Sequence, residues 1–334
     1  PVSTTSPWSR SGLLKKPKDG NMEYDVAIIG AGITGSAIAM ELSKFKLDVC
    51  VIEKSDDVSM GTSKANSGII HAGYDPKPGS LMASLNILGS RMYEKLSKNL
   101  DFPYKKIGAL VLGFNEEDSK HIKTLYERGL LNGLSEENLK ILSKEELFSL
   151  EPNVNEGAIL ALYAKDSAIV SPYLVTLAFM ENAVDNGSTL FLNSQVHSIE
   201  KKGDTFEIST SRDVIKSKIV VNAAGLYADS ICQMVGGRKF SILPRMGEYF
   251  LLDKKCSHLA SHTIFQTPDL MGKGILLTPT VDGNILAGPS AVDIFDKENT
   301  QTTREGQDFV FERACKSLPS LPKRNIIKIG RAYV

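Results

Sequence analysis

The sequence predicts an α/β fold with a parallel βαβ unit near the N-terminus and a strand-rich part toward the C-terminus. Two apolar runs, Tyr24 to Gly30 and Leu47 to Glu53, flank a helical stretch within about 30 residues, the length of one βαβ unit. After Pro244 the chain contains several short strand candidates separated by turns. These patterns together place the chain in the α/β class.

Length and composition are those of an ordinary globular protein. The 334 residues suffice for two domains of about 150 residues each, and 42% are hydrophobic and 23% charged. These values exclude disordered, collagenous and coiled-coil proteins. Lys plus Arg and Asp plus Glu both number 39, which argues against a nucleic-acid partner because such proteins usually show a basic excess.

Cysteine spacing and the N-terminal sequence indicate the cellular compartment of the protein. The four cysteines form no C-x-x-C pair, so we expect no metal site, and scattered thiols fit a reducing compartment. An apolar run of about 18 residues is absent, and the N-terminus lacks the apolar core of a signal peptide. We therefore expect a cytoplasmic protein, with a peripheral membrane contact left open. Residues 1–22, rich in Ser, Thr, Pro and Lys, are expected to be a disordered leader.

Local patterns predict the elements in order. Strand 24–30, helix 33–45 and strand 47–53 form the βαβ unit, whose strands must pair in parallel because the helix returns the chain to the same end of the sheet. Helical spacing recurs at 84–98 and 171–187, and residues 116–150 are helical in character. Further strands are predicted at 107–114, 189–199, 204–211, 219–223, 247–253, 274–279 and 284–288.

Residues 30–35 read G-A-G-I-T-G at the junction of the first strand and the helix. In this pattern Gly30 permits a tight turn, Gly32 lets the backbone approach a pyrophosphate, and Gly35 lets helix and strand pack closely. The helix N-terminus then offers N–H groups to the anion. Glu53 ends the second strand, where its carboxylate can accept hydrogen bonds from a ribose diol. The motif predicts a dinucleotide site but does not separate NAD from FAD.

Two stretches of small residues follow predicted strands. The first runs from Thr62 to Tyr74 and contains His71, and the second runs from Ile219 to Asp229. Small side chains let the backbone lie against a flat ligand, so both stretches are candidate cofactor contacts.

On these residues the sequence resembles the FAD-dependent glycerol-3-phosphate dehydrogenase/oxidase family, within the D-amino-acid-oxidase-like group of flavoproteins. The resemblance runs from about Tyr24 to Asn325. The stretches that carry it are Tyr24–Leu42, Thr62–Leu81 and Gly272–Asp293, with additions at Asn222–Asp229 and Pro244–Tyr249.

The resemblance implies a Rossmann-like FAD-binding domain interleaved with a sheet-rich α+β substrate domain. The FAD-binding domain would comprise 23–95, 166–238 and 325–334, and the substrate domain 96–165 and 239–324. Members of this family usually continue further, with a loop and helix that face the flavin. We therefore expect this chain to lack the usual C-terminal segment and its FAD-binding domain to be incomplete.

The resemblance also implies a reaction, the oxidation of sn-glycerol 3-phosphate to dihydroxyacetone phosphate by hydride transfer to flavin N5. His71 would be the base and Lys273 would hold the developing ketone oxygen. The implied cofactor contacts are Gly30, Gly32, Ile33, Thr34, Gly35, Glu53, Lys54, Thr62, Ser63, Asn66, Ser67, Gly68, Val196, Ala223, Ala224 and Gly225. The implied substrate contacts are Ser67, His71, Arg245, Tyr249, Lys273 and Arg331.

Several alternatives stay open. Arg245 could equally form a salt bridge at a sheet edge, and Lys273 could be a solvated loop lysine. The substrate could be another hydroxy acid, such as L-2-hydroxyglutarate, or an amine. The chain could also be a truncated, non-catalytic nucleotide-binding relative. The electron acceptor, whether oxygen, a quinone or a partner protein, is not encoded in any motif.

Overall fold

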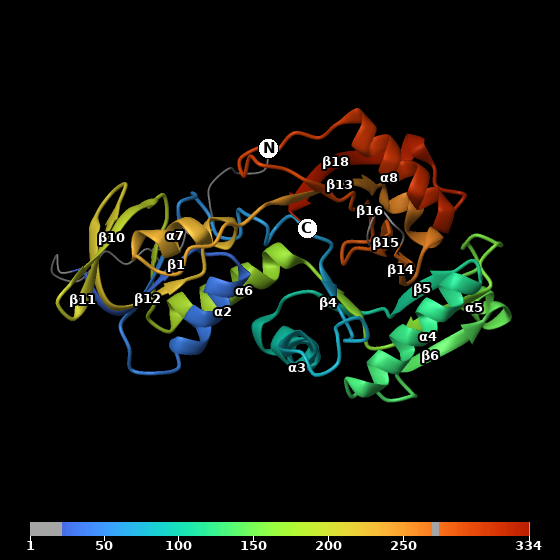
Figure 1. Ribbon diagram of the computed structural model, residues 1–334, viewed down its shortest axis with the longest axis horizontal. Coiled ribbons are helices and arrows are strands. Elements are labelled where there is room, and N and C mark those ends of the chain that lie inside the picture. Colours follow the sequence, from blue (N-terminus) through green and yellow to red (C-terminus); the bar gives the residue numbers. More distant parts are fainter. Residues whose placement is uncertain (1–21, 269–273, 334) are drawn as a thin grey trace. The chain divides into compact units, whose positions relative to one another are not determined.

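The computed structural model describes residues 22–268 and 274–333, which form two compact units (Figure 1). Of these residues, the first unit contains Met22–Ala65 and Pro172–Pro244, and the second contains Asn66–Ser171 and the described residues from Arg245 onward. Each unit is thus built from two chain segments. Residues 1–21 of the predicted leader lie outside the described residues. Residues 66–95 and 325–334, which were assigned to the FAD-binding domain, lie in the second unit. The functional domain boundaries themselves stay a prediction.

The first unit is organised around a six-stranded sheet with the order β10-β11-β12-β1-β2-β9 among the described residues. The strands are β1 (Glu23–Ile29), β2 (Val49–Ile52), β9 (Thr189–Phe191), β10 (Val196–Lys202), β11 (Thr205–Thr210) and β12 (Val214–Asn222). β1 pairs in parallel with both β2 and β12, and β2 pairs in parallel with β9. The predicted parallel βαβ unit is therefore confirmed. β10, β11 and β12 form an antiparallel meander at one edge.

Helices α2 (Ile33–Leu42) and α6 (Pro172–Asp185) pack against each other in this unit, as Figure 1 shows. α2 is the crossover helix between β1 and β2. A 3₁₀ turn, η2 (Gly225–Tyr227), leads from β12 into α7 (Ala228–Met234). Buried apolar residues from β1, β2, β10, β11, β12 and α7 form the core.

Two strand predictions in this unit were wrong in detail. The strand predicted at 189–199 is two strands, because Asn193 adopts a left-handed backbone with φ of 54°. This turn sends β9 and β10 to opposite edges of the sheet. The strand predicted at 219–223 begins earlier, at Val214, and its residue Ile219 is 55% exposed. β12 lies between β11 and β1, so its backbone is paired on both sides although this side chain is exposed.

The second unit contains a nine-stranded sheet among its described residues. Its main path runs β17-β13-β16-β15-β14-β5-β7-β6, and β18 pairs with β13. The strands are β5 (Ala109–Gly113), β6 (Leu139–Ser143), β7 (Leu160–Ala164), β13 (Arg245–Leu252), β14 (Thr263–Gln266), β15 (Leu276–Pro279), β16 (Ile285–Gly288), β17 (Val292–Asp293) and β18 (Ile326–Tyr333). The strands predicted at 274–279 and 284–288 correspond to β15 and β16, which pair in antiparallel fashion.

Helices line this sheet. In Figure 1, α4 (Glu116–Leu131) and α5 (Lys144–Leu150) lie along β5, β6 and β7, and α8 (Arg304–Ser317) lies along β13 and β16. The 3₁₀ turns η3 (Lys254–Leu259) and η4 (Lys323–Asn325) connect elements of this part. The helical expectation for 116–150 was wrong at 139–143, where β6 pairs with β7 and buries Leu139 and Leu142.

A smaller sheet in the second unit has the order β3-β8-β4. It consists of β3 (Ile69–Ile70), β4 (Tyr104–Lys106) and β8 (Ala168–Val170). Helix α3 (Leu81–Leu100) precedes β4 and is capped by the Ser80 side chain. The apolar stripe that predicted this helix is exposed, with Leu85 at 55% and Leu88 at 56%. Across the described residues, we find no helix with the length and apolarity that crossing a bilayer requires.

Candidate functional site

The glycine-rich turn between β1 and α2 has the geometry that its sequence predicted. Gly30 has a φ of 105°, and a Cβ there would lie 2.5 Å from the carbonyl oxygen of Ala223. A Cβ on Gly35 would lie 1.9 Å from the carbonyl oxygen of Gly30. Both clashes involve backbone atoms, so only glycine fits these positions. Gly35 therefore permits the close approach of α2 to the end of β1, and Gly30 permits that of the turn to the residues after β12.

Gly32 occupies a different environment, at the N-terminus of α2. It is the N-cap residue, and the helix has no side-chain cap and no acidic residue in its first turn. A Cβ on Gly32 would meet only the Ser63 side chain, with Oγ at 3.0 Å. Ser63 Oγ in turn accepts a hydrogen bond of 2.9 Å from the N–H of Ile33. Packing within the chain therefore does not require glycine at position 32. The N-terminus of α2, which Gly32 leaves without a side chain, carries a partial positive charge that suits an anion.

The Glu53 carboxylate is fixed beside this turn. Its Oε2 accepts a hydrogen bond of 2.8 Å from the N–H of Ala31, and its Oε1 accepts one of 2.9 Å from the N–H of Ser55. Each carboxylate oxygen retains further acceptor capacity for a ligand hydroxyl. The neighbouring Lys54 ammonium lies 3.9 Å from the ring centroid of Tyr227, in a cation–π arrangement.

The second stretch of small residues closes the other side of the turn. The N–H of Ala223 donates to the carbonyl oxygen of Ile29 at 2.9 Å, which extends the β1–β12 pairing. Gly225, with a φ of 54°, then opens the 3₁₀ turn. Val196 is 8% exposed and belongs to the core of the unit, so its side chain supports the sheet. The first unit brings together Gly30–Gly35, Glu53, Ser63 and Ala223 as one connected set.

In the second unit, the loop that leads into β3 carries the next predicted residues. Asn66 Oδ1 accepts a hydrogen bond of 2.9 Å from the N–H of Gly68, whose φ is 65°. The Gly68 carbonyl then accepts from Val170 and starts the pairing of β3 with β8. Ser67, between them, is hydrogen-bonded through its side chain to Tyr249 on β13. Burial raises the pKa of the Tyr249 phenol to about 12, while the Ser67 hydrogen bond acts in the opposite direction.

His71 directly follows β3, and its side chain is exposed. Its ring centroid lies 5.9 Å from that of Phe265 on β14, at an interplanar angle of 34°. The aromatic contact orients the imidazole against the large sheet of the same unit. Lys273, the second predicted catalytic residue, lies outside the described residues.

The two predicted substrate arginines both have protein partners. Arg245 forms a bidentate salt bridge with Asp293, with distances of 2.7 Å from Nε and 3.1 Å from Nη2. This is the sheet-edge ion pair that the sequence left as the alternative. Arg331 Nη1 lies 3.2 Å from the carbonyl oxygen of Gln301 and 2.8 Å from Met246 Sδ. Whether either arginine contacts substrate stays a prediction.

Sequence reasoning missed Glu248, which is fully buried. Its carboxylate accepts hydrogen bonds from the backbone and side chain of Thr303, at 3.0 and 2.8 Å, and from Gln307 at 3.1 Å. A Cβ on Gly306 would lie 2.6 Å from this carboxylate. Glu248 therefore fixes the first turn of α8 to β13. The sequence signal that could have indicated its burial is that Glu248 is the one charged residue in the apolar run 246–252.

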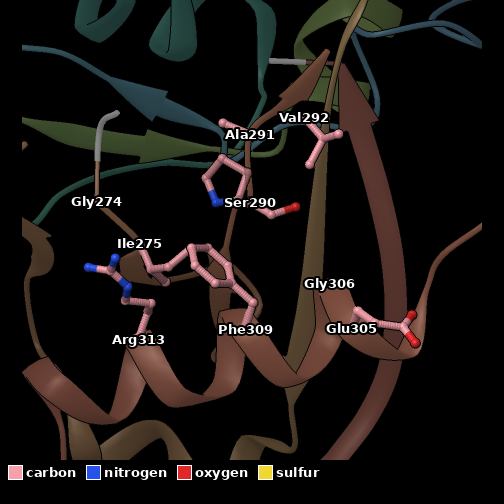
Figure 2. A pocket seen from close by; sticks show the side chains of 10 residues that line it. Gly274, Ile275, Ser290, Ala291, Val292, Glu305, Gly306, Phe309 and Arg313 are labelled. Carbon is pink, nitrogen blue, oxygen red and sulfur yellow. The ribbon is translucent and has the colours of Figure 1, made fainter. Parts of the chain in front are cut away.

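A cavity of about 250 Å³ lies beside α8 in the second unit (Figure 2). The Phe309 ring stands in it, and Figure 2 shows Arg313 and Glu305 on opposite sides of that ring. Its other lining residues are Gly274, Ile275, Pro289, Ser290, Ala291, Val292 and Gly306. None of the predicted site residues within the described ranges lines this cavity.

Comparison with known proteins agrees with this geometry. The family model described as "DAO: FAD dependent oxidoreductase" matches residues 25–334. A protein named glycerol 3-phosphate dehydrogenase, from Caloramator mitchellensis, is 49% identical over 299 residues, covering 90% of this chain. The chain spans 62% of the length of that relative.

Two further matches come from Mycoplasma pneumoniae. A protein named glycerol 3-phosphate oxidase is 35% identical over 309 residues, covering 91% of this chain and 80% of the relative. The solved structure described as dithionite-reduced L-alpha-glycerophosphate oxidase with FAD bound superimposes with a TM-score of 0.87 at 33% identity. It covers 93% of this chain and 83% of that one.

Proposed function

Because this chain belongs to the family of FAD-dependent oxidoreductases, we propose that it oxidises sn-glycerol 3-phosphate to dihydroxyacetone phosphate. The family resemblance, the α/β class and the FAD cofactor expected from the sequence are confirmed. The observation that carries the substrate assignment is the 49% identity to a glycerol 3-phosphate dehydrogenase over 90% of the chain.

The first unit fits the dinucleotide part of FAD. The turn at Gly30 and Gly35 leaves no room for side chains, and Gly32 leaves the end of α2 uncapped toward a pyrophosphate. Glu53, held by two backbone N–H groups, would accept the ribose hydroxyls. When bound, the flavin supplies the acceptor for the hydride that leaves the secondary alcohol carbon.

The chain must take the alcohol proton, and we assign this step to His71. An imidazole titrates near neutral pH, so its neutral form can accept the hydroxyl proton as the alcohol becomes a ketone. The position after β3 and the contact with Phe265 support this role, because both limit the orientations of the ring. Lys273 is proposed to stabilise negative charge on the substrate oxygen, since an ammonium is suited to that task.

Substrate binding is proposed for residues of the second unit. The Tyr249 phenol, with its pKa raised to about 12, is protonated at neutral pH and can act as a hydrogen-bond partner together with Ser67. Arg331 and Arg245 are proposed for the phosphate, since a guanidinium matches a phosphate in a bidentate manner. For Arg245 to bind the phosphate, its guanidinium must contact Asp293 and the phosphate together, or its salt bridge with Asp293 must break.

The proposal is tested by flavin reduction without oxygen. The purified chain is loaded with FAD, freed of unbound flavin, and mixed anaerobically with sn-glycerol 3-phosphate while the visible spectrum is recorded. Bleaching of the flavin band is expected. A bound flavin that bleaches only with L-2-hydroxyglutarate would replace the substrate assignment, and a chain that retains no flavin would overturn catalysis by this chain. Reoxidation with oxygen or with a quinone then identifies the electron acceptor.

A further inference from the structure

We propose that a second cavity, which we call the α3 pocket, is a regulatory site for a small phosphate-bearing anion. The cavity measures about 240 Å³ and lies in the second unit between α3, β4 and the turn after α4. None of its lining residues is one of the predicted site residues. The lining residues that carry the argument are Ser90, Arg91, Lys106, Ser135, Asn138 and Asp166.

Several polar side chains that line this pocket have donors without a partner among the described residues. The side chains of Arg91, Ser90, Ser135 and Asn138 make no hydrogen bond or ion pair with the described part of the chain. A guanidinium, two hydroxyls and an amide offer many donors in one concave place. A ligand that carries several acceptor oxygens satisfies such a set, and phosphate does so most fully.

The charge balance of the pocket also favours an anion. Its two carboxylates are already paired, Asp166 with Lys106 at 2.6 Å and Glu94 with Lys98 at 3.1 Å. Of the two cationic residues that line the pocket, Arg91 is the one without an ion-pair partner among the described residues. A dianionic ligand would be attracted to it. Lys106 also lines the pocket and can donate to a ligand, although its charge is balanced by Asp166.

Size limits the ligand. A cavity of about 240 Å³ is suited to inorganic phosphate or a short phosphomonoester. Inorganic phosphate and a phosphomonoester share the phosphate group and differ in the substituent that the ester carries.

The pocket is connected through one row of backbone pairs to the residue we assign as the base. Ala168 on β8 pairs with Lys106 of β4 on one side and with Ile70 of β3 on the other. His71 follows Ile70 directly, and the next residue, Ala72, is buried and lines the pocket. A ligand held by Arg91 and Lys106 would therefore bias the position of His71 without contacting the substrate. This part of the proposal rests on the proposed function.

Binding is tested on the FAD-loaded chain, labelled with ¹⁵N, by following the arginine Nε–H resonances during titration with inorganic phosphate. The Arg91 signal is assigned as the one missing from Arg91→Gln. We expect it to shift saturably, and we expect Ser135→Ala to weaken the apparent Kd several-fold, since a hydrogen bond to a charged group is lost. Lys95→Gln, which removes a charge from α3 outside the pocket, should leave the Kd within about twofold.

The same titration with glycerol 2-phosphate separates the two ligand sources, because tighter binding of the ester would identify a phosphomonoester. An Arg91 signal that does not move with either probe would overturn the site. A shift that Lys95→Gln weakens as much as Ser135→Ala would also overturn it, because the effect would then be general attraction to the helix.

Coupling is tested by turnover at saturating substrate, where competition at the substrate site is suppressed. Phosphate should change kcat in the wild type by at least about twofold and leave kcat of Arg91→Gln unchanged. Equal effects in both proteins would overturn the coupling to His71. The resonance titration needs no turnover, so a chain that fails to oxidise glycerol 3-phosphate would refute the proposed function and leave the binding test intact.

Discussion

The Ser67 side chain is hydrogen-bonded to the phenol of Tyr249, which ties the loop before β3 to strand β13 of the large sheet. Tyr249 is only 7% exposed, and this burial is the main cause of its raised pKa. The loop of Asn66–Gly68 is therefore held at one end by a buried phenol. Because the two residues are 182 positions apart (249 minus 67), no local sequence pattern could have shown the contact.

The buried phenol makes stability depend on alkaline pH. The pKa of Tyr249 is about 12 in the folded chain against 10.0 for an ordinary tyrosine, so the unfolded chain loses this proton first. The contribution is fully present below pH 10 and is lost as the pH rises toward 12, by about 3 kcal/mol in total. Other tyrosines with raised pKa values add to the wild-type loss. Between pH 8 and pH 11 in urea unfolding, Tyr249→Phe should therefore lose less stability than the wild type, by about half of that 3 kcal/mol. Tyr126→Phe, a phenol elsewhere in the same unit, serves as the control, and an identical pH response of the two variants would contradict the assignment.

The three glycines of the turn should separate folding from cofactor binding. Gly35→Ala places a Cβ against the Gly30 carbonyl and is expected to destabilise the fold by about 3 kcal/mol or more, measured by urea unfolding. A Cβ at Gly32 would meet only the Ser63 side chain, so Gly32→Val should fold yet lose FAD, because the added atoms take the place of the pyrophosphate. Circular dichroism and the 450 nm flavin band report the two properties. A folded Gly32→Val protein that stays yellow would contradict the placement of the cofactor.

Removing the proposed base should slow turnover without releasing the cofactor. His71→Ala is expected to lower kcat by about 10²–10⁴, because a positioned general base contributes that much, while the flavin spectrum is retained. Exogenous imidazole should restore part of the rate, and the wild-type dependence of kcat on neutral pH should disappear in the variant. His258→Ala, an exposed histidine of η3, is the matched control. Wild-type turnover in His71→Ala would remove this residue from the mechanism.

The parts of the site that the sequence predicted are those whose constraints are local. The turn at Gly30 and the helix after it follow from neighbouring residues, because a positive φ and a close approach restrict the residue type at one position. Contacts across the chain were not predictable in the same way. The link from Ser63 to Ile33 spans 30 positions and depends on how the loop folds back over α2. The burial of Glu248 depends on α8, which the pattern of β13 alone does not encode.

Segments of mixed character also escaped prediction for physical reasons. Residues 139–143 contain charged and apolar side chains that suit an amphipathic helix as well as a strand. Pairing with β7 decides for the strand, since it satisfies the backbone and buries Leu139. At Asn193 one residue with a left-handed backbone separates two strands, and asparagine tolerates this conformation without requiring it.

The role of Arg245 can be resolved by comparing it with its ion-pair partner. If the guanidinium serves only the edge of the sheet, Arg245→Gln and Asp293→Asn remove the same exposed salt bridge, and both should leave stability and KM almost unchanged. If Arg245 also binds the substrate phosphate, Arg245→Gln should raise KM at least about tenfold, because a charged hydrogen bond to the ligand is lost. Asp293→Asn should then leave KM unchanged or lower it, since the arginine is no longer held by the carboxylate. We expect this second pattern from steady-state kinetics with sn-glycerol 3-phosphate, and equal KM values for the two variants would assign Arg245 to the sheet edge alone.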